Sequence, residues 1–360
     1  MPAAARPRSR AELGGVASAL QGDVRAAPLR PMFDLLREAG IEALPLLRRN
    51  GFKPADFDDP ESRVDFFRAA RLVDDAARAT GHGDFGLRIG QRFEFADLGL
   101  LAALMGAAPT VGDAIASLQR WFHLHDRGAV PVLRDAGDGL VGLGYALLHH
   151  DTPGANHVLD IAVVIAWRLL AALCGPGWRA VQVNLAHGIA PHAAAYRRCF
   201  GAPVQFDAAH SEVLFERRWL AAPVAGADAA RLAAMREFAA QADAGQERSV
   251  GERARSAAQL LALQGQMGEG ALAAALGLSR RTLRRRLGDE GTSVRATVGL
   301  ARFEWACQLL RQTRLPVADI AAALHYADAT AFARAFKVWA GMPPSRWRAL
   351  QPPRMRSAPG

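Results

Sequence analysis

The side chains best suited to chemistry in this chain are basic and hydroxyl groups that recur on two short segments near its C-terminus. They are Ser279, Arg280, Arg281, Thr282, Arg284 and Arg285 in the first segment, and Ala329, Thr330, Arg334 and Lys337 in the second. Arginine can donate two hydrogen bonds to a guanine edge, arginine and lysine both neutralise phosphates, and short side chains can contact thymine methyl groups. These residue types therefore indicate contact with DNA.

The two segments belong to a sequence unit that occurs twice, over residues 272–287 and 320–337, with one extra residue in the second turn. Three alanines in each copy favour a closely packed first helix. Gly277 lies where a turn requires a left-handed residue, and Ser279 and Asp328 are suited to cap the helix that follows. Each copy is therefore predicted to be a helix-turn-helix unit.

The second helix of each unit has one apolar and one basic face. Leu283 and Leu287 lie opposite the arginines of the first copy, and Phe332 and Phe336 repeat at helical spacing in the second. A solvated basic face is an equal alternative for one such helix, but two matched helices in tandem favour reading of DNA. Residues 294–310 are predicted to form one rigid helix between the units, so that both reading helices enter successive major grooves ~34 Å apart.

The same stretch carries a specific pattern of residues. Its first unit has Ser279, Thr282, Leu283, Arg285, Leu287 and Gly291, and its second half has Arg302, Ala306, Leu309, Leu310, Ile320, Ala321, Leu324, Phe332, Arg334, Phe336, Lys337, Trp339, Gly341, Pro343 or Pro344 and Arg348. With these positions, residues 270–348 resemble the AraC/XylS-type DNA-binding domain. Two positions depart from the family pattern: His325 stands where glycine is usual, and Val294 replaces a small residue or proline.

The positive charge lies in the same part of the chain. The 360 residues carry a formal net charge of +9. Residues 251–350 hold 15 Lys+Arg and 7 Asp+Glu, and residues 351–360 add Arg354 and Arg356, so residues 1–250 carry a net charge of only −1. This asymmetry points to a polyanionic partner for the C-terminal part alone.

Residues that could serve other chemistry form no recognisable set. The cysteines, Cys174, Cys199 and Cys307, lack zinc or redox spacing and are interpreted as small core residues of a reduced, cytoplasmic protein. The histidines lack the helical spacing of a metal pair; they are His123, His125, His149, His150 and His157. No phosphate-binding loop or nucleophile motif is present, so we expect no catalytic site, no metal and no cofactor.

The longest apolar run, residues 158–173, is interrupted by Asp160 and Arg168. It is too short and too charged to span a bilayer, so it is predicted to be a buried helix. A buried charge requires a partner. For each of these two residues, an internal ion pair or a position at the solvent edge is favoured over contact with a polar ligand.

Upstream of the paired units, patterning predicts a mixed α/β domain. Residues 1–29 are expected to be a disordered tail, residues 30–243 a domain, and residues 244–249 a linker. Within the domain, helical patterns precede a β-hairpin over residues 130–148 and short strands near residues 181–185, 204–206 and 212–216. Residues 244–350 would form the second domain and residues 351–360 a tail.

Part of this upstream domain also carries a recognisable pattern of residues. Its residues are Tyr196, Phe200, Gly201, Pro203, Val204, Phe206, Leu214, Phe215, Leu220 and Pro223, with Gly83, Asp84, Phe85, Gly86, Leu87, Leu98, Gly99, Pro109, Thr110 and Ala114 before them. They resemble the N-terminal effector-binding domain of the AraC branch that includes ornithine-utilisation and several virulence regulators. The resemblance implies a small-molecule sensor and a dimer contact.

The sequence thus predicts an α+β protein: a mixed α/β sensor domain followed by an all-α domain with two helix-turn-helix units joined by a linker helix. The expected function is a cytoplasmic, effector-responsive transcription regulator, most simply an activator. Its expected partners are double-stranded DNA, a small-molecule effector, a second copy of the chain and RNA polymerase, without a membrane. Two alternatives stay open: an architectural DNA-binding protein without an effector, and an enzyme with a DNA-binding appendage. A cavity in residues 30–225 would favour the sensor, and the effector-binding residues are not readable.

Overall fold

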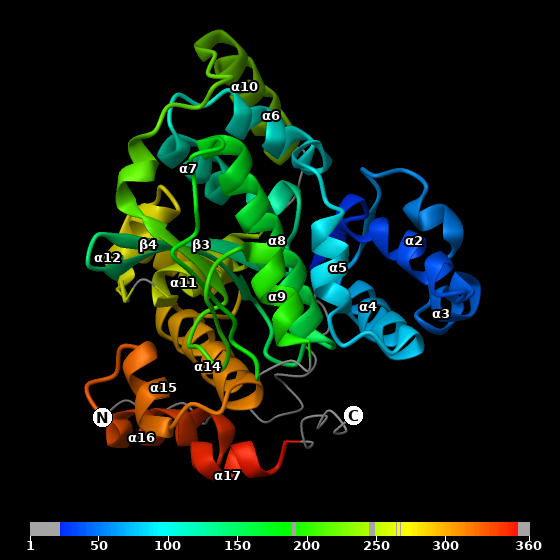
Figure 1. The fold of residues 1–360 in the computed structure, drawn as a ribbon. Coiled ribbons are helices and arrows are strands. Elements are labelled where there is room, and N and C mark those ends of the chain that lie inside the picture. The colour runs from blue at the N-terminus through cyan, green and yellow to red at the C-terminus, as the bar shows by residue number, and fades with distance from the viewer. Residues whose placement is uncertain (1–21, 189–191, 245–248, 264, 267, 352–360) are drawn as a thin grey trace, which may run out of the picture.

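The computed structural model describes residues 22–188, 192–244, 249–263, 265–266 and 268–351. Most of the tails predicted over residues 1–29 and 351–360, and the middle of the predicted linker, lie outside these residues. The described chain is an α+β protein with a mixed N-terminal part and a helical C-terminal part, as the patterning predicted (Figure 1).

The chain begins with a small helical layer beside a two-stranded sheet. Strand β1 (Asp23–Arg25) pairs antiparallel with β2 (Arg63–Asp65). The helices of this layer are α2 (Pro31–Glu38), α3 (Ala43–Arg49), α4 (Phe66–Thr80) and α5 (Phe85–Gln91), with the short 3-10 helices η1 (Ala27–Leu29) and η2 (Pro54–Phe57). The predicted disordered tail is therefore wrong for residues 23–29. Val24, Ala26 and Leu29 are buried, because they join the apolar core beneath α4.

A five-stranded sheet forms the centre of the N-terminal part. Its strands are β3 (Ala129–Gly137), β4 (Leu140–Leu147), β5 (Gln182–Asn184), β6 (Val204–Gln205) and β7 (Glu212–Glu216). Their order is β3-β4-β7-β5-β6, with β5 and β6 parallel and every other pair antiparallel. The predicted hairpin is confirmed as β3–β4, whose turn places Asp138 at a φ of 50° between two left-handed glycines.

The predicted buried helix is α8 (Ala155–Cys174), which packs against β4 and β7 on one side and against α4 and α5 on the other. In Figure 1 it separates the sheet from the blue α2–α4 layer. Glycine permits its close crossing with α5, because a Cβ on Gly86 would lie 2.3 Å from the backbone oxygen of His157. Among the described residues, α8 is the helix long and apolar enough to cross a membrane, and half of that stretch is buried in the protein.

The buried charge of α8 has internal partners. Asp160 is 2% exposed. It accepts hydrogen bonds from Nε2 of His187 at 2.8 Å and from the hydroxyl of Tyr196 at 2.7 Å. These contacts tie α8 to the end of β5 and to α9 (Ala193–Phe200). Arg168 is half-buried.

Further helices surround the sheet. On the α8 side are α6 (Leu100–Gly106), α7 (Val111–Trp121) and α10 (Ala229–Ala244), with η3 (Phe95–Leu98), η4 (Phe122–Leu124) and η5 (Arg217–Ala221). The C-terminal part comprises α11 (Val250–Leu263), α12 (Glu269–Ala275), α13 (Arg280–Asp289), α14 (Val294–Gln312), α15 (Val317–Ala323), α16 (Ala329–Ala340) and α17 (Pro344–Ala349).

The opposite face of the sheet is partly covered by the C-terminal part. Helix α11 contacts β3, and Val132 and Ala146 of the hairpin share an apolar cluster with Trp305 of α14. Residues of β3 and β4 alternate between the two faces. The sheet therefore lies between α8 on one side and α11 with α14 on the other.

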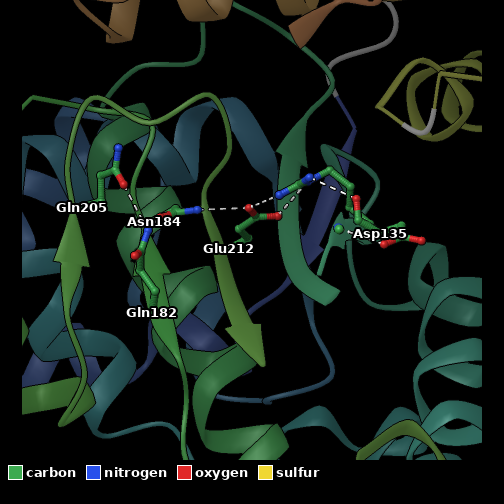
Figure 2. Close-up of polar contacts among 7 residues, drawn as sticks. Asp135, Gln182, Asn184, Gln205 and Glu212 are labelled. Atoms are coloured by element: carbon green, nitrogen blue, oxygen red, sulfur yellow. Dashed lines mark hydrogen bonds and ion pairs between the residues drawn. The ribbon is translucent and has the colours of Figure 1, made fainter. Parts of the chain in front are cut away.

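Polar side chains cross this second face in a row (Figure 2). Glu212, 2% exposed, accepts hydrogen bonds from Nη2 of Arg134 at 2.6 Å and from Asn184 at 3.2 Å. Gln182 continues the row by donating to Asn184 at 2.6 Å and to Gln205 at 3.0 Å. The row joins side chains of β3, β7, β5 and β6, and it satisfies a carboxylate that would be costly to bury alone.

Candidate nucleic-acid interface

The first repeated unit is a helix-turn-helix formed by α12 and α13. Gly277 has a φ of 65° in the turn, and Ser279 caps α13 by accepting a hydrogen bond from the amide of Thr282 at 3.1 Å. Leu283 and Leu287 are fully buried against α11 and α14. Local turn chemistry and the apolar stripe therefore set the orientation of α13, as predicted.

The second unit is formed by α15 and α16. His325 occupies the turn at a φ of 57°, the left-handed conformation that glycine adopts at the equivalent position. Asp328 caps α16 by accepting a hydrogen bond from the amide of Ala331 at 2.7 Å. Phe332 and Phe336 are buried, whereas Trp339 is half-buried and stacks on Phe303 of α14.

Helix α14 joins the two units as predicted. Its Ala301 belongs to the core of the first unit, and its Ala306, Leu309 and Leu310 belong to the core of the second. One continuous helix therefore contributes to both cores. A change in the position of α14 would be transmitted to both α13 and α16.

The predicted DNA-contacting side chains lie together on the outer faces of α13 and α16. Those with exposed residues are Ser279, Arg280, Arg281, Arg284, Arg285, Thr330, Arg334 and Lys337. Thr282 and Ala329 are half-buried near the starts of the two helices. The outer faces thus combine guanidinium, ammonium and hydroxyl groups with the positive charge that a DNA backbone requires.

The arginines of α13 differ in their partners. Arg284 binds Glu269 of α12 through two contacts, Nε to Oε1 at 2.6 Å and Nη2 to Oε2 at 2.7 Å. The hydrogen bond from Arg284 lowers the pKa of Glu269. Arg285 binds Asp289 at 3.1 Å, while Arg281 forms no ion pair with any described residue. Of the three arginines Arg281, Arg284 and Arg285, Arg281 is therefore the one whose guanidinium is not held by a neighbouring carboxylate. Sequence analysis did not identify Glu269 as a partner of these arginines. Its sequence indication is that it is an acidic residue at the start of an otherwise basic unit.

The histidines that sequence analysis set aside have separate partners. His123 contacts Asp243 at 2.7 Å, His149 contacts Arg255 at 3.3 Å, and His150 contacts Glu304 at 2.6 Å. In the part of the chain that the structure describes, no three His, Cys, Asp or Glu side chains form a group that could hold a metal.

A polar seam joins the two parts of the chain. Glu304 of α14 is buried and accepts hydrogen bonds from the backbone amide of His150 at 2.9 Å and from its ring. Arg255 of α11 lies 3.9 Å from the same carboxylate, and Arg311 donates to the backbone oxygen of His150 at 3.2 Å. Burial acts to raise the pKa of Glu304, but the hydrogen bonds from His150 and the charges of His150 and Arg255 lower it overall. The seam was not predicted, because its members are distant in sequence.

A cavity of about 100 Å³ lies on the other side of the hairpin, between the sheet, α4, α7 and α8. Its walls are mostly apolar and include Phe66, Leu118, Leu143 and Leu169. Its remaining lining includes His125, Asp126, Pro131, Gly144 and Tyr145. Tyr145 and Gly144 also line the small space between β4 and Trp305 of α14. A single strand therefore separates the cavity from the linker helix.

Comparison with known proteins agrees with this architecture. Residues 40–224 match the arabinose-binding domain of AraC transcription regulator, N-terminal, and residues 272–350 match a helix-turn-helix domain. The chain is 30% identical over 88% of its length, and 94% of the relative's, to an uncharacterised HTH-type transcriptional regulator of Mycobacterium tuberculosis (strain H37Rv). It is 26% identical to the HTH-type transcriptional regulator VirS of that strain, covering 91% of this chain and 96% of VirS.

A third relative is the ornithine utilization regulator of Pseudomonas aeruginosa, at 26% identity over 90% of this chain and 96% of that protein. These relatives are transcriptional regulators, and none is named as an enzyme. The N-terminal match covers half of the chain, and the relatives align along nearly all of it. The chain belongs to the AraC family of transcriptional regulators.

Proposed function

We propose that this protein is a cytoplasmic, effector-responsive transcription regulator that reads a specific DNA site with α13 and α16. The observation that carries the proposal is the pair of capped, amphipathic helices whose basic and hydroxyl side chains are exposed on both units of one rigid domain. Base edges give specificity and phosphates give most of the affinity. Both kinds of contact are available on each helix.

The two helices contribute unequally. Arg281 donates to a base edge from α13, whereas Arg284 must first exchange its contact with Glu269 for one with DNA, so its net contribution is smaller. In α16, Ala329 and Thr330 suit thymine methyl groups, and Lys337 suits a phosphate. Ser279, Arg280, Thr282, Arg285 and Arg334 complete the contact set on both helices.

The N-terminal part supplies the response. Its cavity favours a small-molecule sensor over an architectural protein with a filled core. A ligand acts only through its different affinities for two arrangements of the protein. The shared wall formed by Gly144 and Tyr145 of β4 offers a direct route from the cavity to α14.

Two further parts of the proposal concern assembly. The chain forms a homodimer through the region around residues 30–243, and it acts as an activator that contacts RNA polymerase. Sedimentation of the full-length protein tests the first part: a strict monomer at micromolar concentration, with and without effector, contradicts it. Reporter transcription from the selected site tests the second, and reduced transcription would make the protein a repressor.

The central test is binding-site selection on the full-length chain, followed by affinity measurements at several salt concentrations. Arg281→Ala should cost about 1–3 kcal/mol and relax specificity at one half of the site. Arg284→Ala should cost less. Lys337→Ala should weaken binding to all sequences alike and lower the salt slope by about one.

Arg231→Ala serves as the matched control, because Arg231 is an exposed basic residue on α10, outside the helix-turn-helix units. It should leave the consensus and the affinity unchanged. If Arg281→Ala and Arg284→Ala both select the same consensus at wild-type affinity, α13 does not read DNA.

A further inference from the structure

The cavity beside β4 has one polar end. Asp126 is 3% exposed, follows η4 and lines the cavity together with His125 and Tyr145. The Asp126 carboxylate accepts hydrogen bonds from the backbone amide of Gly128 at 2.6 Å and from the hydroxyl of Tyr145. A carboxylate has about four acceptor positions. Two donors therefore leave it able to accept more hydrogen bonds.

The nearby cations are held by other groups. Arg63 binds Asp23 and the backbone oxygen of Leu124, the latter at 2.6 Å. Arg25 binds Glu61 and donates to the backbone oxygen of Asp97 at 2.9 Å. No described arginine or lysine forms an ion pair with Asp126.

The imidazole ring of the neighbouring residue, His125, does not provide a positive charge for Asp126 either. His125 is buried, and Nη1 of Arg25 lies 3.4 Å from its Nδ1. Burial lowers the pKa of His125 to about 3, so the ring is neutral. Because arginine can only donate, Nδ1 is the acceptor and Nε2 carries the proton. The cavity thus combines apolar walls with a buried carboxyl group that lacks a cationic partner.

We propose that the effector is a compact apolar molecule bearing one primary amine, whose ammonium group binds Asp126 while its hydrocarbon part fills the apolar walls of the cavity. This inference rests on the proposed sensor function and names the class of ligand. The ammonium group would donate hydrogen bonds to the carboxylate and complete a buried ion pair. The hydroxyl of Tyr145 in β4 donates to the same carboxylate, so the new contact would also change the hydrogen bonding of Tyr145.

Other ligand classes fit the cavity less well. An anion would meet Asp126 with like charge, and a sugar would leave several hydroxyl groups unpaired against apolar walls. A cavity of roughly 150 Å³ accommodates benzene, so this smaller one suits roughly four to six non-hydrogen atoms. The ligand therefore resembles a short branched aliphatic amine in size.

The charge of Asp126 gives the binding a characteristic pH dependence. Burial raises the pKa of Asp126 to about 7, although its hydrogen bond with Tyr145 and the charge of Arg63 oppose the rise. Asp23 acts in the same direction as burial. An ammonium ligand requires the carboxylate, so its affinity should rise about tenfold between pH 6 and pH 8. A neutral ligand should show little change.

The experiment compares three probes of similar shape: isobutylamine, isobutanol and isobutyrate. Calorimetric titration of the full-length protein at pH 8 should give a dissociation constant for isobutylamine at least tenfold below that for isobutanol, with no binding of isobutyrate. Asp126→Asn should bring the amine and the alcohol within about threefold of each other. Glu237→Gln, which removes an equal charge from exposed α10, should change nothing.

A second variant locates the site. Ala166 lines the cavity and is 8% exposed, so Ala166→Leu should fill the space and abolish binding of isobutylamine even if Asp126→Asn does not fold. If isobutanol or isobutyrate binds the wild-type cavity more tightly than isobutylamine, the amine class is wrong but the sensor stands. If no probe binds, the inference is overturned, while DNA binding is judged separately by site selection.

Discussion

Replacing Asp126 by asparagine should change how the stability of the protein depends on pH. The pKa of Asp126 is about 7 in the folded chain, because burial raises it from the value of 3.8 that is usual for an exposed aspartate. The folded state therefore binds this proton more tightly than the unfolded state. Between about pH 4 and pH 7 the unfolded chain has lost the proton and the folded chain retains it, so the free energy of unfolding falls as pH rises. Above about pH 7 Asp126 is ionised in both states, so its effect on the free energy of unfolding no longer changes with pH.

The magnitude follows from the size of the shift. About three pKa units at ~1.36 kcal/mol per unit correspond to a penalty of about 4 kcal/mol at pH 8. Asparagine is neutral at every pH. Its Oδ1 can accept from the amide of Gly128, and its Nδ2, in place of the second carboxylate oxygen, can donate to the hydroxyl oxygen of Tyr145. Relative to the wild type, Asp126→Asn should therefore gain about 4 kcal/mol of unfolding free energy between pH 4 and pH 8.

Urea denaturation followed by circular dichroism, at intervals of half a pH unit, measures this difference. His125 also titrates, because burial lowers its pKa, but it is present in both proteins and cancels in the comparison. Glu237→Gln is the control and should parallel the wild type. The difference in unfolding free energy between Asp126→Asn and the wild type could instead stay constant to within ~1 kcal/mol between pH 4 and pH 8. That result would refute the claim that Asp126 is a buried carboxyl group without a cationic partner.

Two other substitutions test the packing and the DNA-binding surface. Glu269→Gln should release Arg284, raise affinity for all DNA sequences and steepen the salt dependence by about one; filter binding over a salt series measures this. Asp319→Asn, an equal charge change at an exposed residue of α15, should have a smaller effect, and equal effects would contradict release of Arg284. Gly86→Ala should cost about 1–3 kcal/mol by thermal or urea unfolding, because the new methyl group meets α8. Gly106→Ala has only one distant neighbour, at 3.7 Å, and should be close to neutral.

The features predicted correctly from sequence depend on neighbours along the chain. Ser279 and Asp328 cap helices because a short oxygen can reach an amide three residues away. His325 follows the same local rule, since its place in the repeat required the left-handed conformation found at Gly277. Regular apolar spacing also predicted α8 and the hairpin. Each of these signals can be read in a window of a few residues.

The features that sequence analysis missed depend on distant contacts. Helix α5 contains two glycines, which argue against a helix locally, yet they are required where α5 crosses α8. Strands β1 and β2 are three residues each and too short for an alternating pattern. Asp126 carries no local sign that it will be buried, because its surroundings come from β1, β2 and β4. Tertiary packing, which one sequence does not reveal, created these sites.

The position of β4 has a thermodynamic consequence for regulation. The Tyr145 ring lies in the wall of the cavity and its hydroxyl binds Asp126, whereas the neighbouring Ala146 shares an apolar cluster with Trp305. A ligand that shifts β4 must therefore alter the packing of α14, which contributes to both helix-turn-helix cores. Coupling of this kind is reciprocal: if the effector changes DNA affinity by some factor, DNA must change effector affinity by the same factor. Titration of isobutylamine with and without the selected DNA site would measure that factor from the side of the sensor.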